Sequence, residues 1–120
     1  MNLIAEFLTK DLKVNFNDHE TEVFSDGANL WRGALSVGGK LLLTEKRLIF
    51  LPHNFNLGFG GKDEYINLAD IHSAKRVKTT AVVDNGLRIT LSDDTELKFV
   101  VNKREQWIEK LDAAHVHIIA

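Results

Sequence analysis

Residues 38–52 read GGKLLLTEKRLIFLP. Gly38-Gly39 is a typical two-residue hairpin signal, and the segment Leu41–Leu51 after it is predicted as a strand because it is rich in apolar residues between turn signals. Before the two glycines, alternate positions from Trp31 to Val37 are apolar or glycine, which is the period of a strand. The stretch therefore predicts two antiparallel strands, with β structure beginning at Leu30.

The downstream sequence continues as alternating apolar positions broken by turn residues. A strand with a turn near Ala69-Asp70 is predicted over residues 65–77. Asp84-Asn85-Gly86 is a strong hairpin signal, since Asn and Gly tolerate a positive φ. Ser92-Asp93-Asp94 turns the chain again between two strands in which every second residue is apolar. The sequence thus predicts a meander of about six or seven strands.

The periodicity changes to that of a helix at Asn102. We expect Asn102 to cap this helix in an arrangement that resembles a capping box with Glu105, and the helix to run to about Ala114. Its apolar face consists of Trp107, Ile108 and Leu111. The predicted fold class is mainly β, a bent antiparallel sheet or partial barrel that the C-terminal helix closes.

Two further predictions concern the region before the sheet. An apolar stripe at helical spacing predicts a short amphipathic N-terminal helix that packs on the domain, with lipid binding as the alternative. The stripe consists of Leu3, Ile4, Phe7 and Leu8. Residues 17–22 are polar and mostly acidic, and we expect them to form a solvated loop.

Composition restricts the classes of function. The chain has 120 residues, of which 44% are hydrophobic and 27% charged, so a single globular domain is expected. The absence of cysteine excludes thiol nucleophiles, disulfides and zinc–thiolate sites. The formal net charge is only −2, which gives no basic arm or acidic tail. No signal peptide or spanning segment is recognisable, and we expect a cytoplasmic location.

Three blocks of residues, with the order of the predicted elements, carry a likeness to a known family. They are Asp26-Gly27-Ala28-Asn29-Leu30-Trp31-Arg32-Gly33, Gly38-Gly39-Lys40-Leu41-x-Leu43-Thr44-x-x-Arg47-Leu48-Ile49-Phe50 and Ile66-x-Leu68-x-Asp70-Ile71. They resemble a GRAM domain of the pleckstrin-homology superfold, and the Leu-Thr-x-x-Arg-Leu-x-Phe block is the most specific part. The resemblance covers roughly residues 20–112 of a single domain spanning 1–120, and the small size is similar to bacterial stand-alone versions. It implies a binding module rather than a catalyst.

Catalytic and metal-binding motifs are poorly represented. None of the serines lies in a Gly-x-Ser-x-Gly elbow. Gly58-x-Gly60-Gly61-Lys62 lacks the Ser or Thr that a phosphate-binding loop carries after its lysine. His115 and His117 would share one face of an extended tail, but no third ligand is fixed nearby, so a solvated tail is expected. We therefore expect no catalytic residue, no metal site and no cofactor.

The densest positive cluster is Lys75-Arg76-x-Lys78. It is either a site of attraction for anionic lipid or phosphate, or an edge of a sheet whose charges are simply solvated. Further basic residues that a sheet would bring near it are Lys62, Lys40 and Arg88. The resemblance implies basic residues around the first hairpin in lipid-binding members, and only Arg32 and Lys40 flank it here.

The second candidate surface is the loop 53–61, in which Phe55, Leu57 and Phe59 share one parity among glycines and asparagines. We expect Phe55 to join the core. Leu57 and Phe59 are candidates for contact with a partner or a membrane.

The function predicted is therefore binding without catalysis. We expect a protein-interaction or scaffolding module with a protein partner. The alternative is peripheral binding to anionic lipid through Lys75, Arg76 and Lys78, which would place the protein at the inner membrane face. No nucleic acid is expected as a partner, because the near-neutral charge comes with no basic surface interleaved with aromatic residues.

Overall fold

A computed structural model describes residues 16–17, 19–32, 35–53 and 62–120. The predicted N-terminal helix lies outside the described residues, as do Phe55, which was expected in the core, and Leu57 and Phe59 of the predicted contact loop.

The described residues form one sheet and one α-helix. The elements are β1 (Glu22–Arg32), β2 (Leu35–Thr44), β3 (Arg47–Pro52), β4 (Glu64–Asn67), a 3₁₀ turn (Leu68–Asp70), β5 (Ile71–Val77), β6 (Gly86–Leu91), β7 (Glu96–Val101), α2 (Arg104–Ala113) and β8 (Ile118–Ile119). The strand order is β4-β3-β2-β1-β7-β6-β5-β8, antiparallel except for the short parallel pairing of β8 with β5. The predicted mainly β fold with a C-terminal helix is confirmed.

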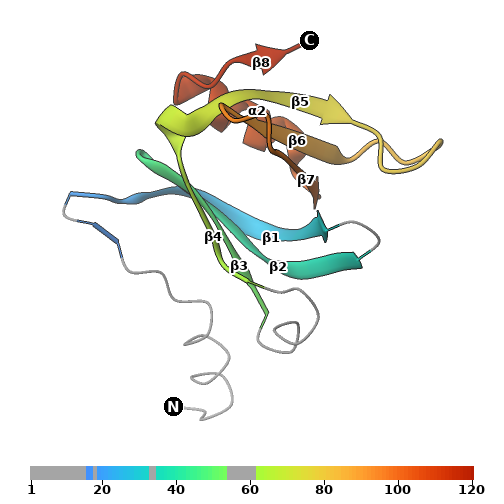
Figure 1. Cartoon of the computed structure of the whole chain (residues 1–120), viewed down its shortest axis with the longest axis horizontal. Coiled ribbons are helices and arrows are strands. Elements are labelled where there is room, and N and C mark those ends of the chain that lie inside the picture. The colour runs from blue at the N-terminus through green and yellow to red at the C-terminus, as the bar shows by residue number, and fades with distance from the viewer. Residues whose placement is uncertain (1–15, 18, 33–34, 54–61) are drawn as a thin grey trace.

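The sheet folds over on itself along β1, which pairs with β2 on one side and with β7 on the other (Figure 1). The strands β1–β4 form the lower half of the view, and β5–β8 with α2 form the upper half. Side chains join the halves: the rings of Phe50 on β3 and Phe99 on β7 lie 5.7 Å apart. Trp107 of α2 is fully buried and meets Phe24 edge-on at 4.7 Å, so the helix closes the core as predicted.

The first hairpin differs from its prediction. β2 runs straight through Gly38-Gly39, so these glycines are not the turn of the hairpin, and β1 and β2 are paired as far as Arg32 and Leu35. A Cβ on Gly39 would clash with the carbonyl oxygen of Leu51, so glycine is needed here because the neighbouring backbone passes very close.

The predicted single strand over 41–51 is instead two strands, β2 and β3, joined by a tight turn at Glu45-Lys46. The hydroxyl of Thr44 makes this turn, accepting the backbone N–H groups of Lys46 at 3.1 Å and Arg47 at 2.9 Å. A threonine hydroxyl that accepts N–H groups two and three residues on offers the backbone an alternative to the ladder, and the strand ends there.

The expected solvated loop over residues 17–22 is wrong at its centre. Glu20 is buried because the guanidinium of Arg47 and the hydroxyl of Thr44 surround its carboxylate, and β1 already begins at Glu22 rather than at Leu30. A buried carboxylate is tolerated when it is paired and hydrogen-bonded in this way.

The helix is present where predicted, but its ends are made differently. The N-cap is Lys103 with no side-chain hydrogen bond, so the expected capping by Asn102 is wrong. At the other end His115 has a φ of 68°, its N–H donates to the carbonyl of Asp112, and the N–H of Val116 donates to that of Leu111. These two bonds are a Schellman motif, which reverses the chain and buries Val116.

The tail after the helix is likewise packed rather than solvated. The N–H of Ala74 donates to the carbonyl of His117 at 2.9 Å, and β8 extends the sheet beside β5. The side chains of His115 and His117 remain exposed.

Two of the predicted turns in the second half are confirmed. The 3₁₀ turn occupies the expected Ala69-Asp70 position, and Ser92-Asp93-Asp94 lies in the turn between β6 and β7. Asp94 adopts a φ of 71° in the turn between β6 and β7, where the N–H of Leu91 donates to the carbonyl of Thr95 at 2.8 Å.

The predicted hairpin turn at Asp84-Asn85-Gly86 is wrong: the chain reverses within residues 79–83, where the N–H of Thr79 donates to the carbonyl of Val83, and Gly86 is already paired with Val77 as the first residue of β6. Glycine is needed there because the backbone of Val77 passes very close.

Candidate functional site

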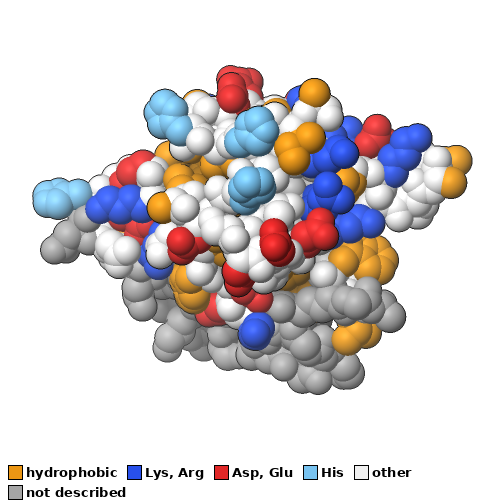
Figure 2. Space-filling model, turned by 45° about the horizontal axis from the view of Figure 1, so that its top comes forward, with side chains coloured by type: hydrophobic (Ala, Val, Ile, Leu, Met, Phe, Trp, Pro, Cys, Tyr) orange, Lys and Arg blue, Asp and Glu red, His pale blue; other side chains and the backbone are white. Residues whose placement is uncertain are grey.

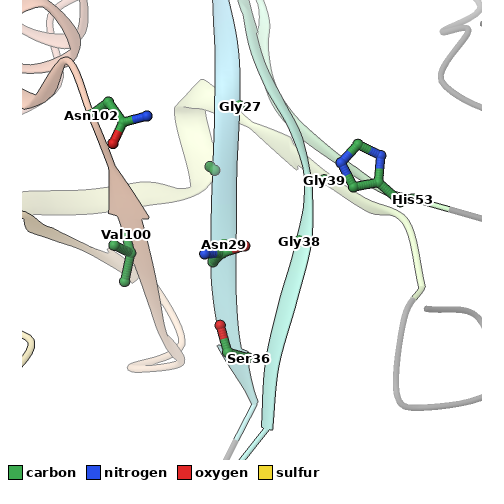
Figure 3. A pocket seen from close by; sticks show the side chains of 9 residues that line it. Gly27, Asn29, Ser36, Gly38, Gly39, His53, Val100 and Asn102 are labelled. Atoms are coloured by element: carbon green, nitrogen blue, oxygen red, sulfur yellow. The ribbon is translucent and has the colours of Figure 1, made fainter. Parts of the chain in front are cut away.

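The side of the sheet away from the core, here called the outer face, is hollowed over β1 and β2. The hollow has a volume of about 550 Å³, and its floor is strand backbone at Gly27, Gly38 and Gly39. Figure 3 shows Val100 and Asn102 on the β7 side of the hollow and His53 on the β3 side. The depression exists because glycines lack the side chains that would otherwise fill the surface of the sheet.

The chemistry of the hollow is that of a neutral hydrogen-bonding surface. Its polar side chains are Asn29, Ser36, His53 and Asn102, and none of the described residues that line it is an acid, a lysine or an arginine. The backbone N–H of His53 donates to the carbonyl of Gly38 at 3.0 Å, which holds the end of β3 against β2 at the edge of the hollow.

The structure divides the predicted basic cluster between the two faces of the sheet. Lys75 pairs in register with Arg88 on the outer face, whereas the next residue, Arg76, points to the side that α2 covers. There Arg76 binds the carboxylate of Glu105 through two nitrogens, at 2.8 and 2.6 Å. This hydrogen bonding raises the pKa of Arg76 and lowers that of Glu105. Lys78 lies beyond the end of β5 and is exposed.

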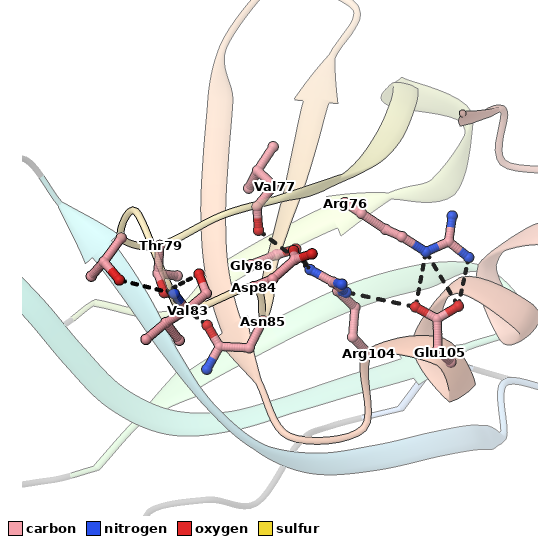
Figure 4. Close-up of polar contacts among 10 residues, drawn as sticks. Arg76, Val77, Thr79, Val83, Asp84, Asn85, Gly86, Arg104 and Glu105 are labelled. Carbon is pink, nitrogen blue, oxygen red and sulfur yellow. Dashed lines mark hydrogen bonds and ion pairs between the residues drawn. The ribbon is translucent and has the colours of Figure 1, made fainter.

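A second arginine, Arg104 of α2, holds the base of the connection between β5 and β6 (Figure 4). Nη1 of Arg104 donates to Asp84 at 2.6 Å and to the carbonyls of Val77 and Gly86, each at 3.3 Å. The hydrogen bond from Arg104 lowers the pKa of Asp84. Arg76 and Arg104 thus tie α2 to the sheet. The spacing of residues in the sequence did not indicate these contacts.

The connection between β5 and β6, residues 78–85, projects from the molecule (Figure 1). In Figure 2 hydrophobic side chains sit at the tip of this projection, with charged side chains nearer its base. Val82 is 90% exposed, yet the backbone beneath it is ordered by the hydroxyl of Thr80, which accepts the N–H of Val83 at 3.0 Å.

Sequence reasoning missed a row of side chains on the outer face. Lys75, Arg88 and Lys98 are register partners on β5, β6 and β7, and Lys98 is in turn the partner of Trp31 on β1. These three cations are called the basic row below. Lys75 and Arg88 were recognised as basic, but Lys98 and Trp31 joined them only once the strand register was known.

The remaining candidate residues lie apart from that row. Lys40 is on β2, in register with Gly27 and Leu51, beside the hollow rather than beside Lys75. Arg32 is the last residue of β1, and its backbone is the register partner of Leu35. Lys62 is exposed and precedes β4.

The described residues form neither a metal site nor a membrane-spanning helix. Within residues 16–17, 19–32, 35–53 and 62–120, no three His, Asp or Glu side chains are grouped to hold a metal ion. No helix of the described chain is long and apolar enough to span a bilayer.

Comparison with known proteins identifies the fold. No family model matches the sequence, and no curated protein matches it. Among solved structures, the C-terminal domain of an unknown protein from Leishmania infantum is similar, with a TM-score of 0.69 and 17% identity over 94% of this chain and 97% of that one. The hSac2 domain from human phosphoinositide phosphatase Sac2 gives 0.66 and 13%, covering 98% and 87%.

The N-terminal PH domain of Vps36 gives a TM-score of 0.62 and 15% identity, covering 88% of this chain and 84% of that one. Identities this low concern the fold alone, so the resemblance to the GRAM family stays a prediction. The chain has the pleckstrin-homology-like fold.

Proposed function

We propose that this pleckstrin-homology-like domain is a protein-interaction module whose contact surface is the outer face around Trp31. The observation that carries the proposal is Trp31 itself, a large aromatic side chain 39% exposed on a central strand beside the hollow. Aromatic residues of this kind are enriched at the centres of protein interfaces, where they supply contact area with few rotatable bonds.

The hollow complements this anchor. Ser36 is the register partner of Trp31 and lines the hollow with Asn29, so hydrogen-bonding groups lie next to the aromatic ring. Protein interfaces combine an apolar anchor with neutral polar groups that set orientation. The absence of charge in the described lining of the hollow suits a backbone or amide partner better than a phosphate headgroup.

Peripheral lipid binding through Lys75, Arg76 and Lys78 is less well supported. Those side chains do not share one face, and Arg76 is already committed to Glu105. Electrostatic attraction to a bilayer needs cations that reach the same surface together.

Site-specific photocrosslinking tests the proposal. A photoreactive phenylalanine analogue in place of Ser36 should crosslink a discrete protein in host cells, and the same analogue at exposed Glu109 on α2 should not. The captured protein, once purified, should bind the unmodified chain and lose at least about tenfold in affinity on Trp31→Ala. Folding of each variant is verified by its thermal unfolding.

Vesicle co-sedimentation is the experiment that can contradict the proposal. Binding to anionic but not neutral vesicles that fades at high salt and requires Lys75 and Lys78, with no adduct at position 36, would overturn the proposal in favour of lipid.

A further inference from the structure

The basic row is an unusual arrangement because its three cations are direct cross-strand neighbours. Register pairs Lys75 with Arg88, and Arg88 with Lys98, so the row crosses three adjacent strands. The positions next to them along the strands, Ala74, Leu87 and Phe99, are buried in the core, so the row faces outward. Like charges placed directly opposite each other destabilise a sheet.

Few of the described residues compensate this positive charge. Glu96 is the one described carboxylate that pairs with the row, with Oε2 3.0 Å from Nε of Arg88. That Nε is buried but not aligned for a hydrogen bond, so among the described residues it has no acceptor. Lys75 and Lys98 have no ion-pair partner in the described part of the chain. The row therefore carries three positive charges against one negative charge, in a protein whose net charge is −2.

We infer that the basic row binds an acidic, extended segment of the protein partner, which crosses the strands from Lys75 and ends against Trp31. This inference rests on the proposed function and names the chemistry of the ligand. Neighbouring strands are about 4.8 Å apart, so the row is about 10 Å long. Alternate side chains of an extended segment are about 7 Å apart, so two or three carboxylates of one segment span the row.

The arrangement favours a narrow ligand over a bilayer. Glu96 is 53% exposed and sits beside Arg88, and the turn that ends these two strands carries Asp93 and Asp94, both exposed. These carboxylates all lie on the turn side of the row, so a wide anionic surface laid on the row meets them, whereas a single extended segment that follows the row passes beside them. Trp31 at the end of the row offers an apolar contact to the same segment.

Fluorescence anisotropy with a labelled synthetic peptide that carries glutamate at alternate positions and one terminal phenylalanine tests the inference. The peptide should bind the intact chain with an affinity that falls as ionic strength rises. The double variant Lys75→Gln with Lys98→Gln should weaken binding about tenfold or more. The matched control, Lys103→Gln with Lys110→Gln, removes the same charge from the α2 side and should bind like the wild type.

The unfolding temperature of the row variant distinguishes loss of the binding site from loss of the fold. Because the row variant relieves repulsion, it should unfold at the same temperature as the wild type or higher. A peptide with glutamine in place of glutamate should bind neither the wild type nor the variants.

The inference is overturned if the glutamate peptide does not bind, or if the row variant and its control lose equal affinity. It is also overturned if the row variant instead abolishes binding to phosphatidylserine vesicles or to a single-stranded thymidine oligonucleotide. A Trp31-dependent crosslink at position 36 with no peptide binding would support the proposed function and overturn the inference that the row binds an acidic segment. Peptide binding through the row with no crosslink would overturn the proposed function and support the inference that the row binds acidic side chains.

Discussion

The carboxylate of Glu20 and the guanidinium of Arg47 form a two-contact ion pair, Nε to Oε2 at 2.9 Å and Nη2 to Oε1 at 2.7 Å. The pair ties the segment before β1 to the turn between β2 and β3. Thr44 adds a hydrogen bond of 2.7 Å to the same carboxylate, and the guanidinium lies 5.5 Å from the centre of the Tyr65 ring. The Thr-x-x-Arg block that carries the family resemblance thus has a structural task.

This ion pair predicts a specific loss of stability in acid. The hydrogen bonds from Arg47 lower the pKa of Glu20 to about 2 from an ordinary 4.5. A carboxyl whose folded pKa is depressed stabilises the fold above its unfolded pKa, and this contribution disappears as the pH falls from about 4.5 to about 2. Urea midpoints measured across that range should drop more steeply for the wild type than for Glu20→Gln. Parallel curves would contradict the assignment.

The close passage of β3 over Gly39 predicts an unequal effect of two glycine substitutions. Gly39→Ala places a Cβ within 3 Å of backbone at Leu51 and Pro52, so we expect a cost of about 2 kcal/mol or more in the free energy of unfolding. Gly27→Ala, whose Cβ would have its nearest contact at 3.9 Å, should change stability by less than about 1 kcal/mol. Equal effects in chemical denaturation would refute the packing argument.

Arg104 predicts a local change in dynamics. Arg104→Ala removes three hydrogen bonds at the base of the 78–85 connection, at a cost of about 1–3 kcal/mol. Amide exchange at Thr79, whose N–H donates to the carbonyl of Val83, should accelerate. Amide exchange in β2 should accelerate no more than the change in global stability accounts for. Unchanged exchange at Thr79 would mean that the connection is ordered without the arginine.

The left-handed residue after α2 predicts a stabilising substitution. His115 holds a φ of 68°, which a side chain adopts at a cost of about 1–2 kcal/mol and glycine adopts freely. Glycine's greater freedom in the unfolded chain returns part of that gain, so His115→Gly should raise the free energy of unfolding by up to about 1 kcal/mol. His115→Val should lower it, because a β-branched side chain fits this conformation worst. The reverse order in thermal melts would exclude the Schellman geometry.

Local patterns were sufficient for much of the second half of the chain. The alternation around Leu87 and Ile89, the Ser92-Asp93-Asp94 turn and the helical spacing of Trp107 and Leu111 each depend on neighbours a few residues away. Strand period, turn chemistry and helix period are properties of a short stretch of backbone, so these elements were predicted close to where they lie.

Partners distant in the chain decided the rest. Gly38-Gly39 has the composition of a turn, and only the passage of β3 beside it makes it strand; Glu20 looks solvated until Arg47, 27 residues away, encloses it. The sequence alone determined a β meander closed by a C-terminal helix, because the period of apolar residues is a local property. Which charges meet, Lys75 with Arg88 and Lys98, and Arg76 with Glu105, was settled by strand register and helix docking, because those contacts join positions that no short window contains.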